Sequence, residues 1–285
     1  MQGKVCLITG ATSGIGAVTA RVLAQQGAAL LLVGRNPDKT RAIVDQLQDQ
    51  TGNRNIVGLL ADLSSQQQIR QLAQQVRDQT PRLDVLVNNA GGIWMKRQET
   101  VDGLEMTFAV NHLAYFLLTH LLLDVLKASA PARIVNVASR AHQGARLDFD
   151  DLQNRRRYSG WRAYTQSKLA NVLFTYELAR RLAGTHVTAN ALHPGFVATG
   201  FGGNNGWKGR LWQFVARFLA ISSEKGARTI LYLATSPEGE GVSGKYFDQE
   251  QAVPSSPASY DASAAERLWQ VSLELTGLVG TVSPR

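Results

Sequence analysis

The sequence has little cysteine and no long apolar run. Its 285 residues include one cysteine, Cys6, so no disulfide can form within the chain. Cys6 lies in an apolar stretch, where we expect a small buried hydrophobic side chain, as is common in the reducing cytoplasm. No apolar run reaches about 18 residues, the length of a transmembrane helix, and the N-terminal MQGKVCLITG leads straight into an expected strand without a signal peptide. These absences predict a cytoplasmic protein.

Patterns for metal or nucleic-acid binding are also absent. The five histidines, at positions 112, 120, 142, 186 and 193, form no HxxxH pair and have no cysteine cluster beside them, so we expect no metal site. The net charge of +8 would suit nucleic acid or a membrane surface. However, the basic residues are scattered, and their one run, Arg155–Arg157, lies in a polar stretch typical of a solvated loop. We therefore expect no nucleic-acid partner.

Short apolar runs alternate along the chain with longer helical patterns. The expected strands are Val5–Thr9, Ala29–Gly34, Ile56–Leu60, Val85–Asn88, Arg133–Val137, Thr188–Leu192 and Lys245–Phe247. The expected helices are Ile15–Gln26, Asp38–Gln50, Gln66–Gln79, Leu104–Ala128, Tyr164–Leu182 and Ser223–Ala234. This alternation predicts an α/β protein with a parallel seven-stranded sheet flanked by helices. No composition break divides the chain, so we expect a single doubly wound domain over residues 1–279 and a flexible tail at 280–285.

A glycine-rich turn, TGATSGIG, follows the first expected strand. Gly10, Gly14 and Gly16 let the backbone turn sharply and approach a pyrophosphate, and Thr12, Ser13 and Ile15 complete the turn. The free N–H groups and the dipole at the start of the next helix favour an anion. Such a glycine triplet is a weak signal alone, but it is a strong one in a strand–turn–helix that opens a βαβ chain. The turn predicts a bound dinucleotide.

Further motifs follow in order: NNAG at Asn88–Gly91, Asn111 in AVNHLAYF, Ser139 at the end of RIVNVAS, YTQSK at Tyr164–Lys168, and HPGFVAT at His193–Thr199. With the GxxxGxG turn, this set resembles the short-chain dehydrogenase/reductases over nearly the whole chain. The resemblance implies a Rossmann fold, a nicotinamide cofactor and a catalytic set of Asn111, Ser139, Tyr164 and Lys168. Ser139 and Tyr164 are separated by 24 intervening residues, and we expect the extended loop between them to shape the substrate pocket.

The resemblance assigns a role to each catalytic residue. A free tyrosine has a pKa of about 10, and a positive neighbour lowers it, so Lys168, four residues from Tyr164 on one helix face, would bring the phenol toward neutral pH. Tyr164 would then protonate a carbonyl oxygen during hydride transfer, and Ser139 would hydrogen-bond that oxygen. Lys168 would also hold the nicotinamide ribose. Asn111 would hold a water that relays the proton outward.

The residues after the second strand indicate NADP(H). NAD-preferring enzymes place a carboxylate here, whereas this chain has Arg35 and Asn36, with Lys39 one turn later. Arg35 can bind the 2′-phosphate through two hydrogen bonds. The resemblance implies further cofactor contacts at Asp62, Leu63, Asn89, Ala90, Gly91, Pro194, Gly195, Val197 and Thr199, besides Tyr164 and Lys168.

The substrate is less directly indicated. YSGWRAYTQSKLANVLFTYELARRL and ALHPGFVATGF resemble the branch with retinol dehydrogenases, WW-domain oxidoreductases and protochlorophyllide reductases. This implies a lipophilic aldehyde or ketone, with retinal the most specific candidate. The alternatives are a general soluble carbonyl reductase, because the membrane anchor common among retinol dehydrogenases is missing, and a non-catalytic scaffold that binds NADPH.

Residues 196–222 are expected to form a lid over the substrate. Their second half is amphipathic, with Trp207, Leu211 and Trp212 on the apolar face. This face could cover a lipophilic substrate, contact a membrane surface weakly or pack in the core. We expect Phe196, Trp207, Leu211 and Trp212 to contact the substrate, together with Ser139 and Tyr164. The two helices at Leu104–Ala128 and Tyr164–Leu182 are those through which family members often pair, so a homodimer is possible.

Overall fold

A computed structural model of the chain describes residues 1–195 and 223–278, so the expected lid and tail lie outside the described residues. The strands are β1 (Val5–Thr9), β2 (Ala29–Gly34), β3 (Ile56–Leu60), β4 (Val85–Asn88), β5 (Ala132–Val137), β6 (Val187–His193), β7 (Tyr246–Asp248) and β8 (Gln251–Ala252). They form one sheet in the order β3-β2-β1-β4-β5-β6-β7-β8. The first seven are parallel as predicted, but the sheet has eight strands, because the two-residue β8 turns back and pairs antiparallel with β7.

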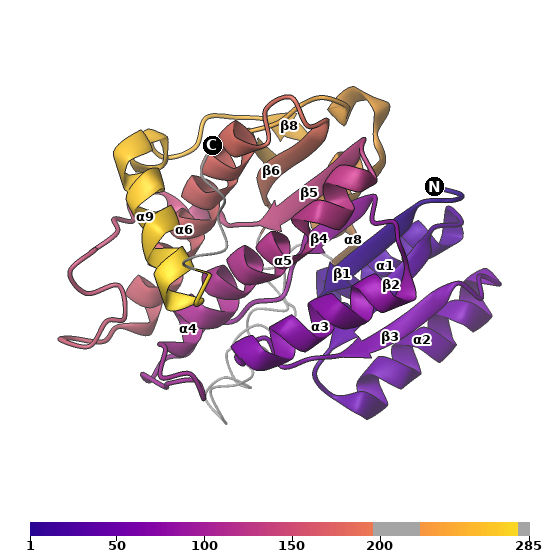
Figure 1. Cartoon of the computed structure of the whole chain (residues 1–285), viewed down its shortest axis with the longest axis horizontal. Coiled ribbons are helices and arrows are strands. Elements are labelled where there is room, and N and C mark those ends of the chain that lie inside the picture. Colours follow the sequence, from indigo (N-terminus) through magenta and orange to yellow (C-terminus); the bar gives the residue numbers. More distant parts are fainter. Residues whose placement is uncertain (196–222, 279–285) are drawn as a thin grey trace.

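The helices are α1 (Gly14–Gln25), α2 (Pro37–Thr51), α3 (Gln66–Gln79), α4 (Met106–Phe108), α5 (Ala114–Ala128), α6 (Gly160–Arg181), α8 (Ser223–Thr235) and α9 (Ala262–Leu275). A π-helical turn, Ala109–Leu113, joins α4 to α5, and 3₁₀ turns lie at Arg140–His142, Pro237–Gly239 and Pro257–Tyr260. Figure 1 shows α3, α5, α6 and α9 on one face of the sheet. Helices α1, α2 and α8 pack against the other face of the sheet.

The strand side chains alternate between two apolar layers. Leu7, Leu31 and Leu86 pack with α3, α5, α6 and α9. Their neighbours Cys6 and Leu30 pack with α1, α2 and α8 on the opposite face. Cys6 has no exposed surface, which confirms the prediction of a buried hydrophobic role, and burial raises the pKa of its thiol to about 12. Strands covered on both faces read as continuous apolar runs, which explains why the sequence located them well.

The 23-residue stretch Met106–Ala128 has the length and composition of a membrane span, with a mean hydropathy of 1.4 over its most apolar 18 residues; it is the one helix of this kind among the described residues. Of its most apolar window, 67% is buried inside the protein. Phe116, Leu118 and Leu122 are core residues against the sheet. Core packing therefore accounts for its apolar character, and length and composition alone do not place it in a membrane.

Helix α9 covers part of the surface at which we expected two copies to pair. The Trp269 ring lies 5.1 Å from that of Phe116 on α5 and 5.9 Å from that of Phe174 on α6. The Arg181 guanidinium stacks over the Trp269 ring at 4.3 Å and forms a 2.6 Å ion pair with Glu266. Helix α9 of the same chain therefore occupies part of the face that we expected a second copy to contact. Homodimerisation stays a prediction.

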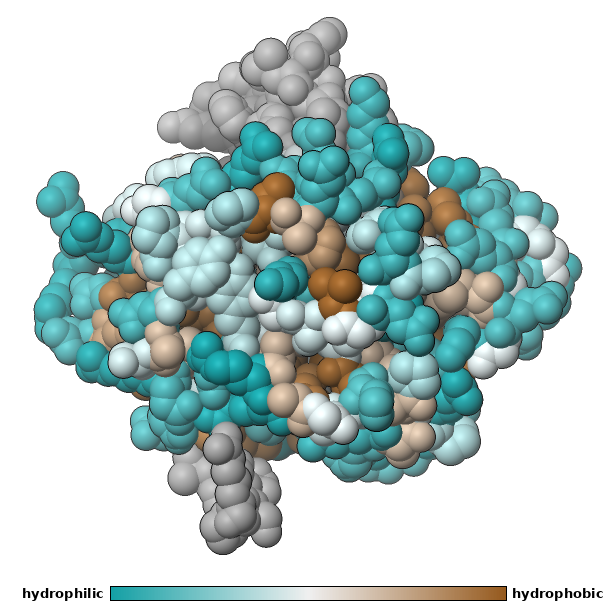
Figure 2. Space-filling view, turned by 90° about the horizontal axis from the view of Figure 1, so that it is seen from above, coloured by the Kyte–Doolittle hydropathy of each residue, from teal (hydrophilic) through white to brown (hydrophobic). Residues whose placement is uncertain are grey.

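The side of the molecule on which the parallel strands begin is mainly hydrophilic, with small separate apolar patches (Figure 2). A hollow of about 790 Å³ lies there, and Lys4, Asp84, Arg133 and Glu240 are among its lining residues. The Arg133 guanidinium in this hollow is already engaged, because it donates to the Leu233 and Ser236 carbonyl oxygens. This hollow contains none of the residues that the sequence motifs single out.

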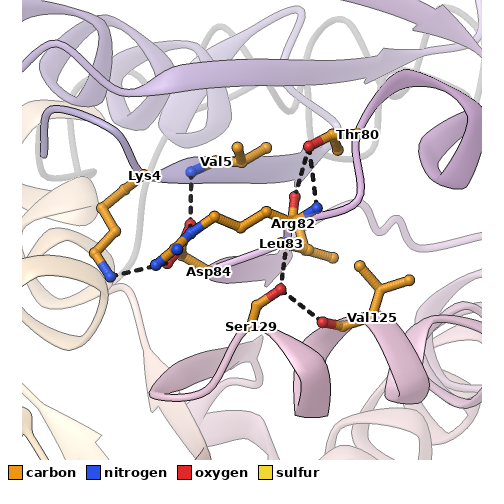
Figure 3. A network of polar contacts seen from close by, with 8 residues as sticks. All are labelled: Lys4, Val5, Thr80, Arg82, Leu83, Asp84, Val125 and Ser129. Carbon is orange, nitrogen blue, oxygen red and sulfur yellow. Dashed lines mark hydrogen bonds and ion pairs between the residues drawn. The ribbon is translucent and has the colours of Figure 1, made fainter.

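Asp84 joins the starts of β1 and β4 at this edge (Figure 3). Its buried carboxylate accepts hydrogen bonds from the Lys4 Nζ at 2.9 Å, the Arg82 Nη2 at 2.7 Å and the Val5 N–H at 2.9 Å. Burial has the largest single influence on the Asp84 pKa and raises it. The hydrogen bonds from Arg82, Lys4 and Val5 together outweigh burial, so the pKa lies below its ordinary value.

Asp84→Asn is expected to lower the free energy of unfolding by about 1–3 kcal/mol at pH 7, because two cations lose their carboxylate partner. The folded pKa is lower than the unfolded one, so this stabilisation is complete above the ordinary value of about 4 and is lost as the pH falls further. Urea denaturation from pH 7 to pH 3 measures it, with the exposed Asp45→Asn as control. A gap between wild type and Asp84→Asn that does not shrink below pH 4 would contradict this assignment.

Candidate active site

The loops after β1, β4 and β5 meet at the carboxyl edge of the sheet, where the strand order reverses between β1 and β4. Gly91, just after β4, marks how closely these loops approach. A Cβ atom built on Gly91 would lie 3.0 Å from the Asn111 Oδ1 and 3.7 Å from the Lys168 Nζ. The fold therefore brings together residues from the β4 loop, the π-helical turn and α6, as the motif order predicted.

Tyr164 and Ser139 form a hydrogen-bonded pair. Tyr164 lies in the second turn of α6, which begins at Gly160 and not at Tyr164 as predicted, because Ser159 caps the helix through the Arg162 N–H. Ser139 follows β5 by two residues and accepts a 3.1 Å hydrogen bond from the Ala141 N–H. Burial raises the pKa of the Tyr164 phenol to about 12, and the hydrogen bond with the Ser139 side chain partly opposes this increase.

Lys168 extends from α6 into the same buried space. Its Nζ donates a 3.0 Å hydrogen bond to the Val137 carbonyl oxygen and lies 5.7 Å from the centre of the Tyr164 ring and 6.0 Å from that of Tyr115. Burial lowers the pKa of Lys168 to about 7. We expected Lys168 to bring the Tyr164 pKa down, but burial dominates both groups and moves the two pKa values in opposite directions.

Hydrogen bonds fix both the oxygen and the nitrogen of the Asn111 side chain, which lies in the π-helical turn. Its Oδ1 accepts from the Gly92 N–H at 2.8 Å, and its Nδ2 donates to the Gly92 carbonyl at 2.9 Å and to the Ser167 Oγ at 3.0 Å. The Asn111 carbonyl accepts a 2.9 Å hydrogen bond from the Asn171 side chain on α6. The asparagine thus joins the β4 loop to α6. The water relay that the resemblance implies stays a prediction.

The glycine-rich turn after β1 has the features of an anion site. Ser13 is the N-cap of α1, but its side chain makes no capping hydrogen bond, and the first turn of α1 has no acidic residue. In contrast, side chains cap α2, α3, α6 and α9. A Cβ on Gly16 would lie 2.3 Å from the Gly10 carbonyl oxygen, so only glycine permits this tight turn. The N–H groups that begin α1 are therefore available to a pyrophosphate, and the turn fits a dinucleotide.

The end of β2 presents cationic groups in place of a carboxylate. Arg35 and Lys39 are exposed there, while the Asn36 side chain caps α2 by accepting a 2.9 Å hydrogen bond from the Lys39 N–H. After β3, one oxygen of the Asp62 carboxylate accepts from the Ser64 N–H and hydroxyl at 2.9 and 2.8 Å. The position and exposure of the Arg35 side chain suit contact with a phosphate, whereas the Asn36 side chain also caps α2.

The remaining expected cofactor residues divide into two groups. Asn89 donates through Nδ2 to the Thr9 carbonyl at 2.8 Å, and the Ala90 N–H donates to the Thr9 Oγ1 at 3.1 Å, so the β4 loop is tied to the end of β1. Leu63 is buried, and Gly195, after Pro194, has a φ of 83°. Val197 and Thr199 lie outside the described residues, as do the expected substrate contacts Phe196, Trp207, Leu211 and Trp212.

Several residues that hold the site were not singled out from the sequence. Ser167 and Asn171 anchor Asn111, and the Val137 carbonyl anchors Lys168. The spacing of Ser167 and Asn171 beside Lys168 on one helix was visible, but a backbone carbonyl has no sequence signal. From the sequence we considered His142 only as a possible metal ligand, but its ring contacts the Ser139 backbone.

A doubly wound α/β fold, a glycine-rich turn suited to an anion, and a Ser–Tyr–Lys set with buried tyrosine and lysine define a nucleotide-dependent oxidoreductase. Residues 4–206 match the family model for short chain dehydrogenases, and the chain belongs to this family. It is 44% identical over 284 residues to human retinol dehydrogenase 13, covering 98% of this chain and 86% of that protein.

Solved structures agree with this assignment. A crystal structure of an uncharacterised protein from Mycobacterium paratuberculosis is 35% identical, with a TM-score of 0.78, and covers 97% of this chain and 94% of that one. The Pseudomonas aeruginosa RhlG/NADP active-site complex is 27% identical, with a TM-score of 0.69, and covers 87% and 94%.

Proposed function

We propose that this chain interconverts a lipophilic aldehyde or ketone and its alcohol, with NADP(H) as cofactor and a retinal-like compound as the best candidate substrate. The observation that carries this proposal is the hydrogen-bonded Ser139–Tyr164 pair beside the buried amine of Lys168. In this account, residues 1–279 act as one NADP(H)-binding domain, with residues 196–222 as its substrate lid. The predicted cytoplasmic location, and the weak membrane contact of the lid, stay predictions.

Each residue of the candidate site has its own role in reduction of the carbonyl. Tyr164, whose pKa of about 12 keeps its phenol protonated at neutral pH, gives its proton to the carbonyl oxygen of the substrate. The Ser139 hydroxyl donates a hydrogen bond to the same oxygen and stabilises the negative charge that develops on it. Lys168, with a pKa of about 7, is partly protonated at pH 7 and would bind the ribose hydroxyls. Bound NADPH supplies the hydride.

Three observations support NADP(H). The uncapped start of α1 suits the pyrophosphate. The exposed Arg35, where NAD-preferring enzymes have a carboxylate, suits the 2′-phosphate. The related RhlG structure was solved with NADP. Arg35, Lys39 and the Gly10–Gly16 turn would therefore hold the adenosine and phosphate portion of the cofactor.

A lipophilic substrate is supported by apolar side chains left exposed beside Tyr164. Trp161 is 59% exposed, with its ring centre 5.8 Å from that of Tyr164. Met95 is 57% exposed, and its Cα would lie 2.7 Å from a Cβ on Gly160, at the start of the same helix. The Tyr158 hydroxyl donates at 2.6 Å to the Trp94 carbonyl and fixes this contact. We refer to the exposed apolar surface of Trp161 and Met95 at the start of α6 as the apolar ledge, and the name of retinol dehydrogenase 13 fits such a surface.

Trp161→Ala tests the ledge. We expect kcat/KM for all-trans-retinal to fall about 10-fold, because burial of such a side chain against substrate contributes about 1.5–3 kcal/mol. Propanal, which is too short to reach the ledge, should change less than about 2-fold. NADPH oxidation assays on purified protein measure both, with Val101→Ala, 84% exposed in another loop, as control. Equal losses for retinal and propanal would exclude Trp161 from the substrate surface.

A further inference from the structure

His142 connects the turn that carries Ser139 to the C-terminal part of the chain. It has no exposed surface. Its Nε2 accepts a 3.0 Å hydrogen bond from the Ser256 backbone N–H, which can only donate, so this nitrogen carries no proton. The proton is therefore on Nδ1, which lies 2.6 Å from the Ser139 carbonyl oxygen and donates to it. The ring forms a two-sided bridge in one defined tautomer.

The bridge adds an anchor to those made by Arg140, whose guanidinium forms a 2.6 Å ion pair with Asp248 on β7. The Ser139 carbonyl also accepts a 3.1 Å hydrogen bond from the His142 N–H, which closes the 3₁₀ turn but binds it to nothing else. The His142 ring packs 4.7 Å from the Tyr246 ring on β7 and reaches Ser256 beyond β8. On the other side, the Arg140 N–H donates to the His193 Nδ1 at 3.3 Å, on β6.

We propose that His142 is a positioning residue for the reaction: its ring ties the backbone of Ser139 to Ser256, and so holds the Ser139 hydroxyl against Tyr164. This inference rests on the proposed function, in which Ser139 contacts the substrate oxygen. The Ser139 side chain is set by its own backbone, since the residue is extended with φ −170° and ψ 154°. A small rotation of this backbone moves the hydroxyl away from the phenol, and misplacement of about 1 Å can lower a rate by about 100-fold.

Ser256→Pro removes one end of the bridge. It deletes the N–H donor at a residue whose φ of −65° suits proline, and the proline Cδ, which takes the place of the hydrogen, displaces the His142 ring from Ser256. Ser256→Ala is the matched control, because it keeps the N–H, and the Ser256 Oγ has no hydrogen-bond partner among the described residues. We expect kcat to fall about 10-fold in Ser256→Pro and about 10-fold to 100-fold in His142→Phe, with an unchanged Kd for NADPH. Ser256→Ala should match wild type.

The double variant His142→Phe/Ser256→Pro decides whether the two residues act through one bond. We expect kcat of the double variant to be no lower than that of His142→Phe alone, because in that variant no hydrogen bond to residue 256 is left for Ser256→Pro to break. Losses that multiply, or a Ser256→Pro variant that matches Ser256→Ala, would overturn the proposal.

A measurement without turnover keeps the inference separate from the proposed function. The ¹⁵N NMR shifts of the His142 ring report its tautomer whether or not a substrate is found. A protonated Nδ1 and an unprotonated Nε2 from pH 6 to pH 8, with the Nε2 signal shifted in Ser256→Pro, support the bridge. The opposite tautomer, or a ring unaffected by Ser256→Pro, overturns it. Wild-type protein that shows the bridge but reduces no carbonyl would count against the proposed function alone.

Discussion

Tyr164→Phe is expected to lower the rate of carbonyl reduction by about 100-fold to 10,000-fold. The substitution removes one hydroxyl, which is hydrogen-bonded to Ser139 and is the proton donor in the proposed reaction. The ring stays in place, so the fold and the NADPH affinity should not change. Steady-state NADPH oxidation measures the rate, and quenching of protein fluorescence by NADPH measures the affinity.

Tyr115→Phe is a closely matched control. Tyr115 is also buried, and its ring centre lies 6.0 Å from the Lys168 Nζ, compared with 5.7 Å for Tyr164. Its hydroxyl has no hydrogen-bond partner within the described part of the chain. We expect this variant to retain nearly full activity. A Tyr164→Phe variant that keeps a tenth of the wild-type rate, or an equal loss in Tyr115→Phe, would refute the assignment of the acid.

Lys168→Met is the second large effect, and it acts on activity and stability in different ways. Turnover should fall about 100-fold or more, because the amine that borders Tyr164 and would hold the ribose is lost. Burial disfavours the charged amine in the folded protein and lowers its pKa from about 10.4 in the unfolded chain to about 7. Lys168→Met removes the free-energy cost of burying this charged amine.

The sign of the stability effect follows from the two pKa values of Lys168. Between pH 7 and about pH 10 the unfolded chain binds more protons at this position, so wild-type stability rises with pH. Below pH 7 the destabilisation by Lys168 is complete and constant. Relative to Lys168→Met, the wild type should therefore be weakest at pH 6 and should recover as the pH rises to 9.5. Urea denaturation measures this, with the exposed Lys127→Met as control; a gap independent of pH would contradict it.

The sequence predicted those parts of the fold that leave a continuous local pattern. The five strands β1–β5 agree to within a residue at each end, since a strand buried on both faces is an apolar run between turns. Helix α3 agrees at both ends because Ser65 caps it and its apolar residues recur with helical period. Motif order predicted that the residues of the candidate site lie together, because parallel strands all end at one edge of the sheet.

Other parts of the fold were not predicted. The two-residue β8 is too short to have a period. We overlooked α9, although its buried residues recur at helical spacing at positions 265, 268, 269, 272 and 273. The expected helix Leu104–Ala128 begins at Met106 and contains a π-helical turn, since apolar periodicity does not distinguish the two helix types. The direction of the Tyr164 pKa shift depends on burial, which the spacing of Tyr164 and Lys168 does not encode.

The central claim is hydride transfer between NADPH and a lipophilic carbonyl with Tyr164 as the acid. The most direct measurement uses NADPH carrying deuterium at either face of carbon 4 of the nicotinamide, with all-trans-retinal and decanal as substrates and mass spectrometry of the alcohols. The account predicts an alcohol with one deuterium on the carbinol carbon from one of the two labelled forms, and almost none from Tyr164→Phe. An alcohol without deuterium from either form, or equal product from Tyr164→Phe, would contradict it.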